Sequence, residues 1–554
     1  MGARRTGGSV PGAGNGGPAD GGAGPVAPGS GGAGSGSAAA DGGARPLLTR
    51  ALLSRRALAR TAVAIAAVPV LPALAACTDA DEAGIVFVAD PTPSAVLPAA
   101  SPAATALSLS ALLVESAEVV ALAPTEAADA LAALIGPAQV PLLVGPDGEI
   151  TEEQVGEELD RLGARTLLIP AGQDAGALGE GRDILEVNLA AEDPSADLPT
   201  VTVGAAPERL TLLLDPEQAL PAAPVASALV TAAGGTVAQV PGGQLGRSAD
   251  SVAVARTAAG EDPTTGVLAL GESFGATDSL AAALEHAATT PELPGGGQIA
   301  FPGRRMIAAY GSPGVPSLGI LGEQGLEETI ARTQQLAADY QGLTDELVIP
   351  AFEIIATIAA DTPGGDGDYS RELSVDSLRE WVDAAGEAGV YVVLDLQPGT
   401  TDFLTQAKRY EELLLEPHVG LALDSEWRLK PGQKHLEQIG SVGGAEVNSV
   451  VTWLADLTAE HGLPQKLLIL HQFTLRMITE RETIDTSRAE LAITLHADGH
   501  GAPGDKLATW NALQQGLPEG IFMAWKNFYD EDSPTFTPEE TYAVEPRPWF
   551  VSYQ

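Results

Sequence analysis

Eight short apolar runs recur between residues 306 and 553 of this 554-residue chain, at 306–310, 347–355, 390–396, 419–423, 466–470, 491–495, 521–525 and 549–553. Amphipathic stretches lie between most of them, as at 325–340, 374–387 and 445–461. Strands that alternate with helices form right-handed βαβ units around a parallel sheet. Eight such units have the size and rhythm of a closed (β/α)8 barrel, which we predict for residues 297–554. The gap between the fifth and sixth runs is short for a helix.

The same alternation begins earlier in the chain with shorter runs. Predicted strands at 118–123, 140–144 and 165–170 are separated by predicted helices at 126–134 and 152–162. This pattern indicates a Rossmann- or flavodoxin-like domain with a parallel sheet, so the chain belongs to the α/β class. None of its Gly-rich stretches gives G-x-G-x-x-G after a strand or a phosphate loop with Gly-Lys-Ser/Thr, so we expect no nucleotide.

Residues 119–172 also carry a family resemblance. A strand and an Ala/Asp-rich helix are followed by Pro-Leu-Leu-Val at 141–144, Gly-Pro-Asp-Gly at 145–148 and Glu-Glu-Leu-Asp-Arg-Leu-Gly-Ala-Arg at 157–165. This order resembles one unit of the cell wall-binding repeat 2 family, whose modules hold exported proteins of Gram-positive bacteria on the wall. The resemblance implies wall binding for residues 106–296, with 210–287 as the candidate for a degraded second copy. A domain of the same fold kept only as a scaffold is the alternative.

Cys77, the single cysteine of the chain, follows an uncharged apolar run at 61–76 that is preceded by Arg55, Arg56 and Arg60. The pattern is typical of a secretory signal, and Leu-Ala-Ala-Cys at 74–77 resembles a bacterial lipobox. The resemblance implies lipid attachment at Cys77 and an extracytoplasmic, membrane-anchored protein. We therefore expect a disordered Gly/Ala-rich leader over 1–46, a lipoprotein signal peptide over 47–76 and a tether over 77–105.

The charge balance excludes one class of partner. The chain has 73 acidic and 30 basic residues, a formal net charge of -43. Nucleic-acid phosphates would be repelled by such a surface. Unaided binding to an anionic membrane or to a phosphate-rich wall polymer is disfavoured for the same reason, so the expected partners are the membrane through the lipid and a wall polymer or glycan.

Polar and aromatic side chains stand where the predicted barrel strands end. In a (β/α)8 barrel these ends meet on one rim, which forms the binding face. Carboxylates and amides hydrogen-bond hydroxyl groups, and flat aromatic rings stack on sugar rings. The rim therefore predicts a carbohydrate ligand, with Tyr310, Gln397, Trp427, His471, Gln472, Asp498, Lys526 and Tyr553 as candidate binding residues.

Asp424 and Glu426 are the leading candidates for catalysis. Glycoside hydrolysis commonly needs two carboxyl groups roughly 5 to 10 Å apart, and residues i and i+2 of a strand share one face. The pair resembles the terminal Asp-x-Glu on the fourth strand of family 18 chitinase-like barrels, which implies Glu426 as the acid and Asp424 as the residue that orients the substrate. The longer acidic ladder of that family is absent. Glu353 and Asp395 are the predicted supporting carboxylates.

His496, Asp498 and His500 alternate along the chain and could face one cation. His500 falls in a Gly-rich loop rather than on the predicted strand, so we expect no metal site and no cofactor. A Ser-His-Asp triad is not expected either, since no serine lies in a Gly-x-Ser-x-Gly elbow.

The segments 303–311, 397–399 and 525–530 are similar to the barrel of uncharacterised actinobacterial surface lipoproteins. This resemblance implies the architecture and the compartment, and it implies no reaction. The first hypothesis is thus a lipid-anchored envelope protein whose barrel binds or hydrolyses an envelope carbohydrate. The alternative is a non-enzymatic surface or scaffold lipoprotein with a catalytically inactive barrel.

Overall fold

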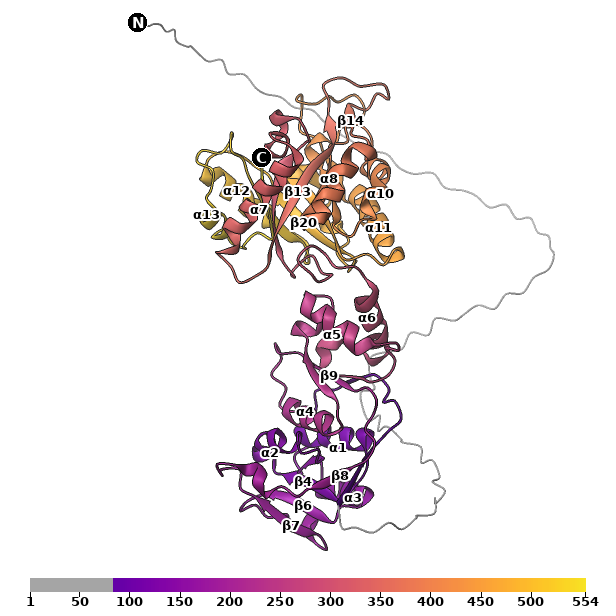
Figure 1. The fold of residues 1–554 in the computed structure, drawn as a ribbon. Coiled ribbons are helices and arrows are strands. Elements are labelled where there is room, and N and C mark those ends of the chain that lie inside the picture. Colours follow the sequence, from indigo (N-terminus) through magenta and orange to yellow (C-terminus); the bar gives the residue numbers. More distant parts are fainter. Residues whose placement is uncertain (1–82) are drawn as a thin grey trace, which may run out of the picture. The chain divides into compact units, whose positions relative to one another are not determined.

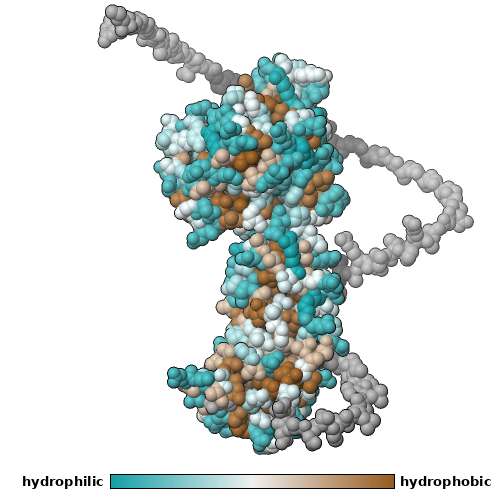
Figure 2. Space-filling model, viewed as in Figure 1, coloured by the Kyte–Doolittle hydropathy of each residue, from teal (hydrophilic) through white to brown (hydrophobic). Residues whose placement is uncertain are grey.

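The computed structural model describes residues 83–554 (Figure 1). The predicted leader, the signal peptide and Cys77 lie outside the described residues. Between residues 83 and 554, no helix is both long enough and apolar enough to cross a bilayer. On the face seen in Figure 2, hydrophobic patches are interspersed among hydrophilic residues.

The N-terminal part contains two four-stranded sheets in which every pairing is parallel. The first has the order β5-β4-β6-β7 and the second the order β10-β9-β11-β2. The strands of the first sheet are β4 (Val119–Ala123), β5 (Leu142–Val144), β6 (Thr166–Pro170) and β7 (Asp183–Val187). Those of the second are β2 (Ala95–Leu97), β9 (Thr211–Leu214), β10 (Thr236–Gln239) and β11 (Val267–Leu270). The predicted α/β class with parallel N-terminal sheets is confirmed.

Helices connect the strands of each sheet in the same way. The first sheet uses α2 (Ala128–Ile135) and α3 (Glu152–Leu162), and the second uses α4 (Ala223–Ala232) and α5 (Ala249–Ala259), with α6 (Thr277–Thr289) after β11. In both sheets the first strand of the βαβαβ unit lies between the second and the third, so the segment 210–287 repeats the strand order of 119–170.

The sequence explains where α3 begins and ends. Thr151 and Gln154 form a capping box, in which each side chain accepts a hydrogen bond from the other residue's backbone N–H. Gly163 ends the helix at φ 74°, a left-handed conformation that costs glycine little.

The described part of the predicted tether contributes to regular structure. β1 (Ala83–Phe87) pairs with β3 (Val114–Ala117) and β8 (Val201–Val203), and β2 is the edge strand of the second parallel sheet. Helix α1 (Pro102–Leu113) begins before the predicted end of the tether at residue 105. Ile85 and Phe87 are buried, because alternate apolar residues of β1 face a core that composition alone does not reveal.

The C-terminal part is a closed barrel of eight parallel strands, as predicted. Around the barrel the order is β12-β13-β15-β16-β18-β20-β21-β22, and β12 pairs with both β13 and β22. The strands are β12 (Arg305–Gly311), β13 (Val348–Ala359), β15 (Tyr391–Leu396), β16 (Val419–Asp424), β18 (Lys466–Gln472), β20 (Leu491–Ala497), β21 (Phe522–Asn527) and β22 (Phe550–Tyr553).

Helices cover the outside of the barrel strands (Figure 1). They are α7 (Leu326–Gln341), α8 (Val375–Glu387), α9 (Phe403–Ala407), α10 (Glu411–Leu414), α11 (Gly444–Glu460), α12 (Pro503–Gln514) and α13 (Pro538–Tyr542). Between β18 and β20 the chain forms only short 3-10 turns and the two-residue β19 (Ile478–Thr479), which pairs with β17 (Val442–Gly443). The short gap noted in the sequence is therefore a connection without an α-helix.

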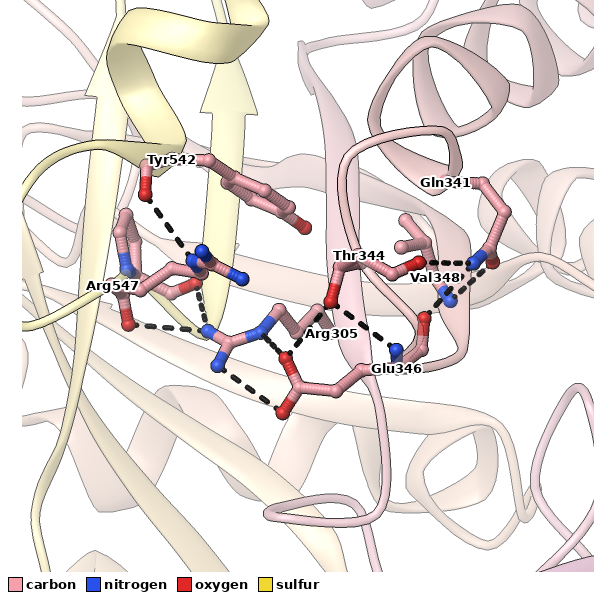
Figure 3. Close-up of polar contacts among 8 residues, drawn as sticks. Arg305, Gln341, Thr344, Glu346, Val348, Tyr542 and Arg547 are labelled. Atoms are coloured by element: carbon pink, nitrogen blue, oxygen red, sulfur yellow. Dashed lines mark hydrogen bonds and ion pairs between the residues drawn. The ribbon is translucent and has the colours of Figure 1, made fainter.

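Arg305 links the first and last strands at the end of the barrel where the strands begin (Figure 3). Its guanidinium donates to the backbone carbonyls of Arg547 and Pro548, at 3.1 and 2.7 Å, just before β22. It also pairs with the carboxylate of Glu346, just before β13, and stacks over Trp549 at 4.1 Å from the ring centroid. One buried side chain thus connects three strands that are neighbours around the barrel, β22, β12 and β13, at the point where the barrel closes.

Candidate functional site

A cavity of about 420 Å³ lies at the ends of the barrel strands. Seven residues predicted from the sequence line it, namely Tyr310, Gln397, Asp424, Glu426, Trp427, Asp498 and Lys526. The cavity therefore gathers three carboxyl groups, an amide, an amine and two aromatic rings from five strand ends.

The remaining lining residues were missed from the sequence. They include Leu318, Ile355, Ile358, Phe473 and Phe528, whereas His500, which also lines the cavity, was considered in the sequence only as a metal ligand. Phe473 and Phe528 each follow a strand directly, after β18 and β21. An aromatic residue one position beyond a polar strand end is the signal that could have found both. The two rings add apolar surface to a lining that also holds the polar groups named above.

Asp424 and Glu426 both line the cavity, but not by the predicted geometry. Strand β16 ends at Asp424, and Ser425–Trp427 form a 3-10 turn. The rule that i and i+2 share a strand face therefore does not apply, and the turn brings Glu426 to the cavity instead. Its side chain is half-buried there, and the next residue, Trp427, also lines the cavity.

A buried polar network lies alongside the lining residues. The two ring nitrogens of His471 lie 2.9 Å from carboxylate oxygens, Nε2 from Glu353 and Nδ1 from Asp498. Tyr310 donates its hydroxyl hydrogen to Asp395 at 2.9 Å. Glu353, Asp395 and His471 are 0% exposed, so they support the lining residues rather than line the cavity themselves.

Gln397 connects this network to the candidate catalytic pair. Its amide nitrogen lies 3.5 Å from both the Tyr310 hydroxyl and the Asp424 carboxylate, and its amide oxygen accepts from the backbone N–H of Ala359 at 3.0 Å. The amide oxygen of Gln397 is thus anchored to the last residue of β13, and its amide nitrogen contacts Asp424.

The carboxyl groups differ in their ease of ionisation. Burial, and after it the charge of Asp498, raises the pKa of Glu426 to about 7. Burial also raises the pKa of Asp395 to about 6 and that of Asp424 well above its usual range. For Asp498 burial would raise the pKa, but the hydrogen bond from His471 and the positive charges of His471 and Lys526 together lower it. The cavity therefore contains both Glu426, which holds its proton near neutral pH, and Asp498, which does not.

The imidazole of His471 responds to the same charges. Burial alone would lower its pKa, but Glu353 and Asp395 raise it well above the usual range. For Glu353 burial would raise the pKa, and His496 and His471 together lower it below the usual range. His471 and Glu353 thus form an ion pair that is removed from solvent.

Lys526 supplies the positive charge of the cavity. Its Nζ lies 3.4 Å from the centroid of the Tyr310 ring and 5.1 Å from that of Phe528. Such a cation–π contact is worth about 0.5 to 2 kcal/mol, depending on desolvation. The ammonium group is thereby held near two rings at the cavity lining.

Besides His471, two predicted binding residues do not line the cavity. Gln472 accepts from Arg481 at 2.9 Å and donates to the backbone at Thr474 and Leu475. The Tyr553 hydroxyl lies 2.7 Å from that of Tyr340 on α7, outside the barrel. Strand side chains alternate between faces, so the neighbours His471 and Ser552 point inward instead.

The spacing His496-x-Asp498-x-His500 does not assemble a trio of ligands. His500 is exposed, with its ring 5.7 Å from that of Phe528, while Asp498 bonds to His471. A different set comes together: one oxygen of Glu353 and one ring nitrogen each of His471 and His496 lie within 4.8 Å of one another, all buried. Oxygens of Asp424 and Asp498 and a ring nitrogen of His471 are equally close.

Comparisons with known proteins add little to this geometry. No family profile and no curated protein sequence matches the chain. Among solved structures, the chain is similar to Cwp6 from Clostridium difficile, with a TM-score of 0.25 and 12% sequence identity over 51% of this chain and 67% of that chain. A TM-score this low carries no functional argument, so the chemistry of the cavity rests on its own residues.

Proposed function

We propose that the barrel cavity binds a carbohydrate of the cell envelope and hydrolyses a glycosidic bond, with Glu426 as the proton donor. The observation that carries this proposal is the position of Glu426. It is half-buried in a cavity with aromatic walls, beside the carboxyl groups of Asp424 and Asp498, and its pKa is about 7. A proton donor for glycoside cleavage needs a raised pKa of this kind.

The remaining lining residues fit this role. The rings of Trp427, Phe473 and Phe528 offer flat apolar faces against which a sugar ring can pack. Gln397 and Lys526 offer donors to hydroxyl or carbonyl oxygens of the ligand. Glu353 and Asp395, which the sequence indicated as supporting carboxylates, act from behind the lining through His471 and Tyr310.

The proposed reaction uses these side chains and one water molecule. Glu426 transfers its proton to the glycosidic oxygen as the bond from that oxygen to the anomeric carbon breaks, with the electron pair leaving on the oxygen. The carboxylate of Asp498 stabilises the positive charge that develops on the sugar ring, and Asp424 orients the substrate. Water then adds to the anomeric carbon, and one of its protons passes to the Glu426 carboxylate, which restores the proton donor.

The envelope location rests on the sequence. The lipobox-like Cys77 supports anchoring on the extracytoplasmic face of the membrane, and the segment 119–172 supports contact with the wall. Both elements would hold the barrel within reach of wall glycans.

The test is incubation of the purified full-length protein with peptidoglycan and with other wall glycans, followed by measurement of released reducing ends. We expect release by the wild type, loss of at least ~100-fold in Glu426→Gln, and no change in Glu437→Gln, which alters an exposed glutamate of the neighbouring loop. Binding without release would support the non-enzymatic alternative and overturn the hydrolytic proposal.

A further inference from the structure

Three buried side chains outside the cavity lining converge on one point in the barrel. Glu353 on β13, His471 on β18 and His496 on β20 come from three different strands. The Glu353 oxygen Oε1 lies 2.9 Å from His471 Nε2 and 3.6 Å from His496 Nδ1. All three residues are 0% exposed.

In each imidazole, the ring nitrogen that does not approach Glu353, called here the outer nitrogen, has its own hydrogen-bond partner. Nδ1 of His471 lies 2.9 Å from the Asp498 carboxylate, and Nε2 of His496 lies 3.1 Å from the Ser552 hydroxyl. A carboxylate can only accept, so His471 donates from Nδ1. A metal ion would replace the proton that His471 otherwise shares with Glu353, and Nε2 would then present its lone pair to the ion while Nδ1 keeps its hydrogen. This arrangement is the usual support of histidine ligands to metals.

Direct hydrogen bonds do not satisfy the atoms that face this point. Within the described part of the chain, Nδ1 of His496, Oε2 of Glu353 and Oδ1 of Asp395 are buried without a hydrogen-bond partner. The Asp395 oxygen lies 3.9 Å from Nε2 of His471, on the same side of the ring as Glu353. A proton on His471 would account for its bond to Glu353, but the other atoms would still lack partners. A buried polar atom without a partner destabilises the folded state.

We infer that Glu353, His471 and His496 bind one divalent transition-metal ion of the Zn²⁺ type. Two imidazoles and one carboxylate are a common ligand set for Zn²⁺, with bonds of about 2.0 to 2.2 Å. Tetrahedral ligands at that bond length lie roughly 3.4 Å apart, and the two separations from Glu353 Oε1 bracket this value. Imidazole ligands disfavour Mg²⁺ and Ca²⁺, which prefer oxygen.

This ion differs from the cation that the sequence spacing suggested, because His500 takes no part and Glu353 does. The inference also goes beyond the proposed carbohydrate chemistry. Its test uses no glycan, so either proposal can fail while the other stands.

The first experiment is calorimetric titration of the chelator-treated full-length protein with Zn²⁺ and, separately, with Mg²⁺, followed by X-ray absorption spectroscopy of the Zn²⁺-loaded protein. We expect one Zn²⁺ per chain, a Zn²⁺ affinity at least roughly 100-fold above that for Mg²⁺, and scattering from two imidazoles. Absence of stoichiometric Zn²⁺ binding, equal affinity for Mg²⁺, or scattering without imidazole would overturn the inference.

Variants then locate the ion. We expect His496→Ala to lower Zn²⁺ affinity by ~100-fold or more and Ser552→Ala, which removes only the outer hydrogen bond, by ~10- to 100-fold. His500→Ala is the matched control and should bind as the wild type does. If His496→Ala does not fold, Ser552→Ala and the absorption spectrum decide. Zn²⁺ binding that survives in both His496→Ala and Ser552→Ala, or that is lost in His500→Ala, would refute the assignment.

Discussion

Substitution of Arg305 by methionine should destabilise the barrel far more than substitution of an exposed arginine. Methionine retains an apolar stem of similar length, so the change isolates the polar contacts of the guanidinium (Figure 3). Those contacts join the chain before β22, through the carbonyls of Arg547 and Pro548, to the chain before β13, through Glu346. The barrel closes at this point, because β12 pairs with both strands.

The expected loss follows from the individual contacts. The side chain of Glu346 is 39% exposed, so water can replace its ion pair, which is worth only about 0 to 1 kcal/mol. The cation–π contact with Trp549 adds about 0.5 to 1 kcal/mol. The two carbonyls lose a charged donor at a buried position, and each costs about 1 kcal/mol or more. Together these contacts predict a loss of about 3 kcal/mol in the free energy of unfolding.

Equilibrium urea denaturation followed by tryptophan fluorescence measures this quantity for the barrel alone, because all six tryptophans lie between residues 381 and 549. The control is Arg332→Met. The Arg332 side chain is 35% exposed and that of its partner Glu323 46% exposed, so a loss below about 1 kcal/mol is expected. If Arg305→Met loses no more stability than Arg332→Met, the barrel is not held closed by this side chain and the reasoning is wrong.

Three further predictions concern pH and anchoring. The pKa of Glu426 is raised to about 7, so reducing-end release should decline as pH rises through about 7 and the donor proton is lost; a flat profile from pH 6 to 9 would contradict its role. Burial lowers the pKa of Lys466 to about 7, although its amine donates to the carbonyls of Glu416 and Val419. In the unfolded chain Lys466 keeps its proton up to a pKa of about 10.4. The contribution of Lys466 to stability is therefore full above that pH and is lost as pH falls through about 7. The wild type should therefore gain stability relative to Lys466→Met between pH 7 and 10 in urea denaturation, and a constant difference would contradict the shift. Cys77→Ser should leave the protein in the soluble fraction or uncleaved, whereas mass spectrometry of the wild type should find an acylated N-terminal Cys77; an intact signal peptide in the wild type would contradict lipidation.

The strands of the barrel could be located from the sequence because each is a short apolar run bounded by polar or Gly-containing segments. The run predicted at 419–423 differs by one residue from β16 (Val419–Asp424). Depth in the barrel was harder to predict. The run at 347–355 made Glu353 look like a strand end, whereas β13 continues to Ala359 and places Glu353 well below the rim.

Side-chain direction was the second limit. Near the end of a strand, adjacent polar or aromatic residues satisfy the pattern equally well, and only the register with neighbouring strands decides which one faces inward. Tyr553 was predicted as a binding residue, but it is the neighbouring Ser552 that faces inward. Gln472 was predicted as a binding residue together with His471, although its side chain bonds to Arg481. The convergence of Glu353 and His496 depends on register across several strands, which no local spacing encodes.

The extension of β13 makes the two sides of the cavity unequal in stiffness. Beyond the barrel, β13 pairs with the antiparallel β14 (Ser370–Glu372) (Figure 1). The Tyr410 hydroxyl braces this hairpin by donating toward the carbonyls of Ala356 and Leu373. On this side Ile355 and Ile358 form a wall that cannot open without breaking strand hydrogen bonds. Across the barrel the wall consists of residues that follow β18, β20 and β21, including His500. Adaptation to ligands of different length therefore falls to that side, and changes of specificity should accumulate in those loops while the hairpin keeps its shape.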